Sequence, residues 1–185
     1  MGDGIRAEYL RESAVTMRKH KVLADESLAR VSDAQFFAAL DAESNSLAVL
    51  VKHVAGNLLS RWTDLLTTDG EKPDRDRDTE FEIAPSDTRA GLMRRWEAGW
   101  ACAFGELEAL TPADLDRTIH IRGEPHTLVQ AINRQIAHAA YHTGQIVFLA
   151  KHLQSGTWQS LSIPRGQSGQ FNAAMLSAPP PNPRL

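Results

Sequence analysis

The sequence contains very little cysteine. Cys102 is the only thiol among 185 residues, which excludes an internal disulfide, a CxxC redox pair and a multi-thiolate metal site. No stretch approaches the roughly eighteen apolar residues of a membrane-spanning helix. The first thirty residues also lack the continuous apolar run of a signal peptide. We therefore expect a reducing, cytoplasmic setting and no membrane partner.

The sequence also has no excess of basic over acidic residues. The chain has 20 Lys and Arg against 23 Asp and Glu, so its formal net charge is −3. Proteins that bind a phosphate backbone present clustered Lys and Arg along one face. Nucleic acid is therefore not an expected partner.

Proline is absent from most of the chain. Four of the nine prolines fall within the last seven residues, and the other five stand at positions 73, 85, 112, 125 and 164. Because proline disrupts helix interiors, the long intervals between these five are where helices can form. We predict a single domain over residues 1–176 and a Pro-rich, disordered tail over 177–185.

Apolar residues recur at helical spacing in four long segments. The predicted helices cover about 5–29, 46–65, 86–110 and 128–154, with a short helical turn at 32–37. Asn45 or Ser46 is suited to cap the second long helix, Ser86 begins the third, and Thr127 is suited to cap the fourth. Only residues 117–126 suit a short extended arm. These elements predict an all-α fold, a four-helix bundle with a C-terminal extension.

Two segments do not fit the helical pattern. Residues 68–85 are charged and rich in turn formers, so we expect a long excursion outside the core, either a solvated loop or a lid over a binding site. Residues 158–170 carry Trp158, Leu161 and Ile163, which must be buried somewhere. Packing on the chain's own bundle is favoured over a role in dimerisation.

Three histidines stand at positions where they could bind one metal ion. His138 and His142 are four residues apart on the fourth helix and share a face, a spacing that lets two imidazoles reach one ion. His53 lies beside the apolar stripe of the second helix. Together they predict a divalent-metal site with at least one position left for water or substrate. The alternative is that His53 only packs in the bundle while the other two face water.

Further polar residues follow the same helix faces. Asn57 and Arg61 continue from His53 in steps of four, and Arg134 and Gln145 flank the other two histidines. Buried polar groups without partners cost about 1 to 3 kcal/mol each, so one shared pocket would explain all of them. We predict these four as substrate-binding residues, with Arg61 or Arg134 suited to a carboxylate.

Several known motifs are absent. The run HAAYH at 138–142 has alanine where a zincin metalloprotease has its general-base glutamate, and no Glu-x-x-His of a di-iron bundle occurs. The chain has no P-loop and no GxGxxG. Trp96 and Trp100 are predicted as core residues.

One histidine on the second helix and an H-x3-H pair on the fourth resemble the DinB/YfiT-like superfamily. The resemblance spans nearly all of residues 5–172 and points to an uncharacterised bacterial branch. It is carried by the runs KHVAGNLLSRW (52–62), LLTTDGEKPDRDRDTEFE (65–82), IRGEPHTLVQAINRQIAHAAYHTGQIV (121–147) and WQSLSIPRGQS (158–168).

This resemblance implies a DinB-like four-helix bundle, often a homodimer, in which His53, His138 and His142 bind zinc or nickel. Some relatives are transferases or isomerases that use the metal to activate a low-molecular-weight thiol. The leading hypothesis is therefore a metal-dependent enzyme, transferase- or hydrolase-like, acting on a small-molecule substrate through activated water or thiol. The alternative is a non-catalytic or stress-related helical bundle in which the metal is structural.

Overall fold

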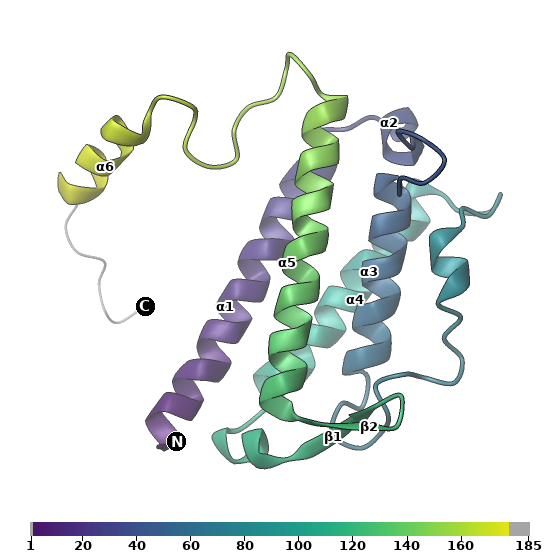
Figure 1. Cartoon of the computed structure of the whole chain (residues 1–185), viewed down its shortest axis with the longest axis vertical. Coiled ribbons are helices and arrows are strands. Elements are labelled where there is room, and N and C mark those ends of the chain that lie inside the picture. The colour runs from purple at the N-terminus through teal and green to yellow at the C-terminus, as the bar shows by residue number, and fades with distance from the viewer. Residues whose placement is uncertain (1, 178–185) are drawn as a thin grey trace.

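Four long helices build the bundle of this chain in a computed structural model, which describes residues 2–177 (Figure 1). They are α1 (Asp3–Leu28), α3 (Leu47–Trp62), α4 (Arg89–Ala109) and α5 (Leu128–Leu153). Helix α3 packs along α4, and α1 packs along α5. The predicted all-α, four-helix fold class is confirmed. None of the described helices is both long and apolar enough to cross a membrane.

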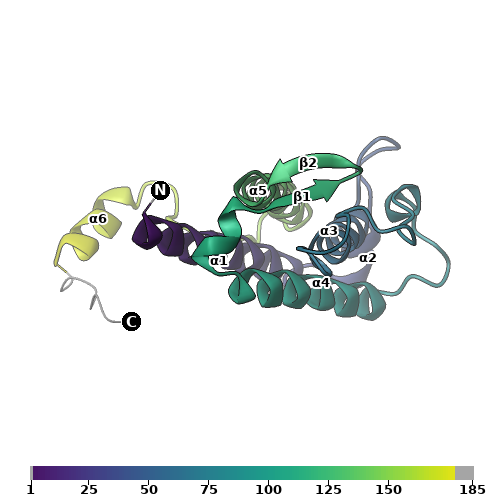
Figure 2. The ribbon, with the colours of Figure 1, turned by 90° about the horizontal axis from the view of Figure 1, so that it is seen from below.

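Short elements lie between these helices or follow the last of them. They are α2 (Asp33–Phe37), the 3-10 helices η1 (Asp78–Phe81) and η2 (Pro112–Asp116), the strands β1 (Thr118–Ile121) and β2 (Glu124–Thr127), and α6 (Ser168–Ser177). The two strands form an antiparallel hairpin with Ile121 opposite Glu124. Seen from below, this hairpin lies across the ends of α5 and α3 (Figure 2). The predicted extended arm is therefore a hairpin that covers this end of the bundle.

Capping residues set the helix starts. Ser46 Oγ accepts a hydrogen bond from the Val49 N–H at 3.2 Å, and Thr127 forms a capping box at the start of α5, as predicted. The third long helix begins later than predicted. Thr88 caps it by accepting a hydrogen bond from the Gly91 N–H, while Asp87 pairs with the Lys52 ammonium and accepts from the Ala84 N–H.

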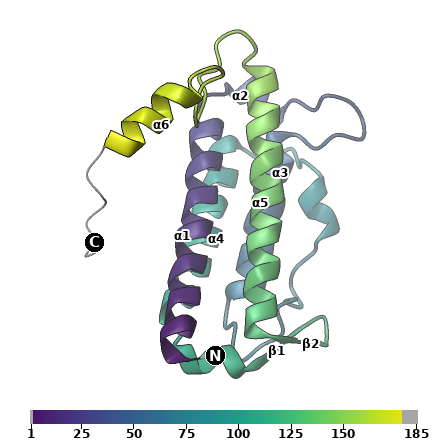
Figure 3. The same ribbon diagram turned by 60° about the vertical axis from the view of Figure 1, so that its left-hand side comes forward.

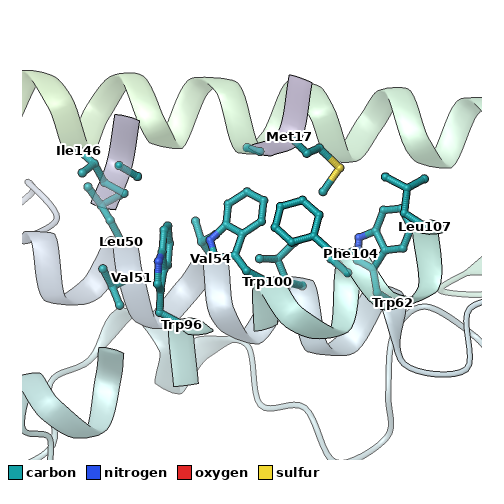
Figure 4. Close-up of a cluster of buried hydrophobic side chains, with 14 of the residues drawn as sticks. Met17, Leu50, Val51, Val54, Trp62, Trp96, Trp100, Phe104, Leu107 and Ile146 are labelled. Carbon is teal, nitrogen blue, oxygen red and sulfur yellow. The ribbon is translucent and has the colours of Figure 1, made fainter. Parts of the chain in front are cut away.

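Aromatic residues of α4 fill the centre of the bundle (Figure 4). Trp96 and Trp100 are each 1% exposed, which confirms their prediction as core residues. Their rings pack edge to face, and Trp100 stacks on Phe104. The indole N–H of Trp96 donates to Asp25 Oδ1 at 2.8 Å, so the one polar atom of this buried ring has a partner.

Residues 63–88, the connection between α3 and α4, form the predicted long charged loop, which is mostly exposed but packs several of its groups against α3 (Figure 1). Ser60 Oγ donates to the Gly70 carbonyl at 2.8 Å, and Lys52 Nζ donates to the Glu82 carbonyl at 2.8 Å. The physical reason lies in α3, where every residue except Leu59 is buried. Its polar side chains need partners, and the charged connection supplies them.

The C-terminal extension contacts the bundle only at its start. The Arg30 guanidinium lies 5.0 Å from the centre of the Trp158 ring and also donates to the Gln159 carbonyl. Beyond it, α6 has no buried residue and points away from the other helices (Figure 3). Packing on the chain's own bundle thus holds for Trp158, whereas the predicted burial of Ile163 is wrong, since that side chain is 37% exposed. Of the predicted tail, Ser177 ends α6 and residues 178–185 lie outside the described residues. The homodimer stays a prediction.

Two glycines of α4 predict opposite effects of the same substitution. A Cβ at Gly99 would lie 3.0 Å from the carbonyl oxygen of Ala55 in α3, whereas one at Gly105 would meet nothing within 4 Å. We expect Gly99→Ala to lower the free energy of unfolding by about 1 to 2 kcal/mol, because the two helices must separate. Gly105→Ala should raise it by about 0.5 to 1 kcal/mol through helix propensity. Urea unfolding measures both, and equal signs would contradict the close α3–α4 contact.

Candidate metal centre

The three predicted histidines come together between α3 and α5. His53, His138 and His142 each offer a ring nitrogen, and these atoms all lie within 4.8 Å of one another. The Nε2 atoms of His53 and His138 are 3.2 Å apart. One turn of α5 separates His138 from His142, so both reach the same point opposite His53. Among the described residues, no other His, Cys, Asp or Glu joins this group.

Two hydrogen bonds fix the orientation of two of these rings. Nδ1 of His53 lies 2.8 Å from Glu80 Oε2, and Nδ1 of His142 lies 2.7 Å from Gln145 Oε1. Both oxygens can only accept, so each Nδ1 carries the proton and each Nε2 keeps its lone pair. These lone pairs face the cluster, which is the arrangement of metal-binding imidazoles supported by outer carboxylate and amide groups.

Burial keeps the imidazoles of α5 neutral. Burial first, and then the neighbouring His142 and His53, lower the pKa of His138 to about 3. Burial likewise lowers the pKa of His142 to about 4, although its hydrogen bond with Gln145 opposes this. Near neutral pH both rings are therefore unprotonated, the form in which histidine binds a metal ion.

Glu80 is the main site residue that the sequence did not reveal. Its carboxylate is 2% exposed and accepts from His53 and from Arg75, whose Nε and Nη2 lie 2.8 and 2.9 Å away. Burial opposes the negative charge, yet the bonds from His53 and Arg75 hold the pKa of Glu80 below its ordinary value. The carboxylate lies against Gly56, where a Cβ would be 2.1 Å from Glu80 Oε1. Only glycine leaves room for this carboxylate against α3.

A cavity of about 210 Å³ adjoins the cluster, and His53 and His138 form part of its wall. Asn57, Arg61 and Arg134, predicted as substrate-binding residues, line it as well. The structure places Gln145 elsewhere: it is not among the lining residues and instead contacts His142. The other lining residues are Trp62, Leu65, Arg75, Arg77, Ile119, Ile121, Arg122, Leu128, Ala131, Ile132, Gln135 and Tyr141.

Arg61 has partners of its own within the chain. Its Nη1 donates to the Gly70 carbonyl and, at 2.8 Å, to Glu71 Oε2. Burial lowers the pKa of Arg61, and the charge of Glu71 opposes that shift. Arg134 forms no ion pair with any described residue and is exposed. Of the two arginines predicted to bind an anion, Arg134 is the one that keeps its donors available.

The residues fit a bound divalent cation. Nε2 of His142 and Nδ1 of His138 are buried and make no hydrogen bond with any described group. Three neutral imidazoles with converging nitrogens are a ligand set that suits zinc, nickel and related ions. Without a cation, the facing Nε2 atoms of His53 and His138 would share only one proton. A cation bound by the Nε2 atoms would use the lone pairs that face the cluster, and Nδ1 of His138 would then carry the proton of that ring.

The tip of the hairpin is held against the cavity by Asp69. Its carboxylate accepts from the backbone N–H groups of Glu71, Arg122 and Gly123 at 2.7 to 2.8 Å. Arg122 and Gly123 both have positive φ, +58° and +74°, a turn conformation that is strained for Arg122. These bonds hold the turn and so place Arg122 in the cavity wall.

Removing the Asp69 carboxylate should alter acid stability. Burial raises the pKa of this group, but the three backbone N–H groups and the Arg61 charge together outweigh it and lower the pKa to about 2, from 3.8. Its stabilisation is therefore complete above pH 3.8 and is lost as the pH falls toward 2. We expect about 1 kcal/mol after solvent screening. Unfolding free energy measured against pH should show this loss in the wild type and in Asp74→Ala but not in Asp69→Ala.

Fold and site together define a helical-bundle protein with a candidate three-histidine metal centre beside a cavity. A family model described as "Protein of unknown function (DUF1572)" matches residues 4–167, and the chain belongs to this family. The comparisons with curated proteins and with solved structures gave no match.

Proposed function

We propose that this chain is a divalent-metal-dependent enzyme of the DinB/YfiT-like superfamily, with His53, His138 and His142 as the metal ligands. One observation carries the proposal: the three converging imidazoles open, through His53 and His138, onto a cavity that could hold a substrate. A closed structural zinc site has four protein ligands, whereas this cluster has three. We propose zinc or nickel as the metal and the cytoplasm as the location.

The residues around such a site would have different roles. A bound divalent cation would supply Lewis acidity, which lowers the pKa of water or of a low-molecular-weight thiol cofactor toward neutrality. Glu80 and Gln145 hold the rings of His53 and His142 in one tautomer. Ile119, Ile132 and Trp62 line the cavity with apolar surface and reduce its water content.

Metal analysis of the full chain, purified without a His tag, tests this proposal. We expect about one equivalent of a divalent metal in the wild type, since three neutral imidazoles converge on one point. His138→Gln should carry almost none, because the two remaining ligands hold a cation weakly. His152→Gln is the matched control, an exposed histidine on the same helix, and should bind like the wild type. A metal-free wild type would overturn the proposal.

The alternative is a structural metal without turnover. The ligands come from two helices, so a cation would tie α3 to α5 and its binding would appear as folding stability. Chelation would then lower the melting temperature strongly, and a cobalt-substituted protein would show no ligand position that exchanges with added thiol or anion. An exchangeable position supports the enzyme instead.

A further inference from the structure

The cavity beside the histidine cluster is basic although the chain as a whole is acidic. No Asp or Glu lines it, whereas Arg61, Arg75, Arg77, Arg122 and Arg134 do. Glu71 and Glu80, just behind the wall, pair with three of these arginines. Arg77 and Arg134 form no ion pair with any described residue. A concave basic surface in a chain of net charge −3 concentrates anions locally.

Two buried donors in the cavity wall have no partner among the described residues. They are the indole Nε1–H of Trp62, 2% exposed, and the amide Nε2 of Gln135, 4% exposed. A buried donor without an acceptor costs about 1 to 3 kcal/mol, which a ligand with acceptor oxygens would recover. One unpartnered buried acceptor, Asn57 Oδ1, lies in the same wall, but the donors outnumber it and, together with the guanidinium groups, suit a group that only accepts hydrogen bonds. Carboxylate and phosphate are such groups.

The remaining wall is apolar. Ile119 and Ile121 of β1 line the cavity together with Leu128 and Ile132 of α5, and all four are buried. The volume of about 210 Å³ is small for a ligand site and suits a body about the size of one ring. The ligand therefore has an apolar part as well as an anionic group.

We infer that this cavity binds a small organic oxyanion, a carboxylate or phosphate on an apolar body, and that Arg134 and Gln135 recognise its anionic group. The inference deepens the proposed function, on which it rests for the claim that the ligand is a substrate. The binding itself depends on the cavity wall and not on a metal. Arg61 is not assigned this role because its Nη1 already donates to the Gly70 carbonyl and to Glu71, whose carboxylate offsets its charge.

Calorimetric titration of the full chain tests the inference, with phenylacetate, phenyl phosphate and the neutral phenylacetamide as probes. The protein is used both as purified and after dialysis against a chelator, so that the cavity wall is tested without metal. We expect at least one of the two anions to bind at least about tenfold more tightly than phenylacetamide in both preparations. The tighter of the two anions identifies the natural anionic group.

Two variants and one control assign the contacts. Arg134→Gln should raise the dissociation constant of the tighter anion about tenfold, and Arg94→Gln, an exposed arginine on α4, should leave it unchanged. Gln135→Leu should raise it about fivefold while the melting temperature stays the same or rises, because its Nε2 has no partner to lose. A merely structural glutamine would instead lower the melting temperature.

Three results would overturn the inference: equal binding of phenylacetamide and the anions, no anion binding at millimolar concentration in the chelated protein, or an Arg134→Gln effect no larger than that of Arg94→Gln. Its failure is separable from that of the proposed function. A metal-free wild type that still binds the anions through Arg134 leaves the inference standing. A protein that contains the metal but does not bind the anions would overturn the inference and leave the proposed metal site unaffected.

Discussion

Replacing Glu80 by alanine should lower the free energy of unfolding by about 3 to 5 kcal/mol. The carboxylate lies between His53 and Arg75, and the Arg75 side chain is only 5% exposed. Its removal leaves a buried guanidinium without its closest acceptor, which costs more than the ion pair itself contributes. The His53 ring also loses the bond that fixes its tautomer, so metal affinity should fall about 10- to 100-fold.

Urea unfolding and metal titration of the full chain measure these two effects. The matched control is Glu82→Ala, since Glu82 is an exposed carboxylate on the same connection that contacts α3 only through its backbone carbonyl. Glu80→Gln adds a second test, because it keeps the shape of the side chain and removes its charge. Similar unfolding free energies for the Glu80→Ala and Glu82→Ala proteins would contradict the buried His53–Glu80–Arg75 arrangement.

Replacing Gly56 by alanine should also be strongly destabilising, by about 3 kcal/mol. The new Cβ would lie 2.1 Å from Glu80 Oε1 and 2.8 Å from Glu80 Cδ, closer than non-bonded atoms can approach. Glu80 cannot simply swing away, because Arg75 and His53 hold both of its oxygens. The substitution therefore forces the connection off α3 and disturbs the histidine cluster.

The double variant Gly56→Ala/Glu80→Ala separates this clash from an ordinary helix effect. Once Glu80 is shortened, alanine at position 56 no longer collides and gains about 0.5 to 1 kcal/mol of helix propensity. We expect Gly56→Ala to destabilise the wild type and to stabilise the Glu80→Ala protein. This change of sign is a coupling free energy between the two positions. Urea unfolding of the wild type, the two single variants and the double variant measures it. Additive effects would mean that the two side chains do not meet.

The sequence predicts the bundle well because helices depend on local patterns of residues. Apolar residues at spacings of three and four define the long helices, and Ser46 and Thr127 cap two of them as expected. The start of α4 is less well predicted. By residue type Ser86 is at least as good a cap as Thr88, so the observed start depends on contacts that residue type does not show, such as the pairing of Asp87 with Lys52, 35 residues away.

The residues of the candidate site also differ in how far local sequence patterns predict them. His138 and His142 share a helix face, so their spacing predicts their proximity, and His53 lies beside the apolar stripe of another helix. Glu80 could not be predicted, because nothing in composition distinguishes it from Asp74, Asp76 or Asp78 nearby. Which acid is buried depends on how the connection packs against α3. The space beside Gly56 exists only in the folded chain.

The order in which the cluster can assemble follows from the separations along the chain. His53 and Glu80 are 27 residues apart, so the connection can fold onto α3 early, at a modest cost in loop entropy. His138 is 85 residues from His53 and reaches it only when α5 docks. A ligand that needs all three imidazoles thus stabilises the docked state alone. Ligand binding would therefore slow the undocking of α5 while leaving the earlier folding of α3 and its connection unaffected.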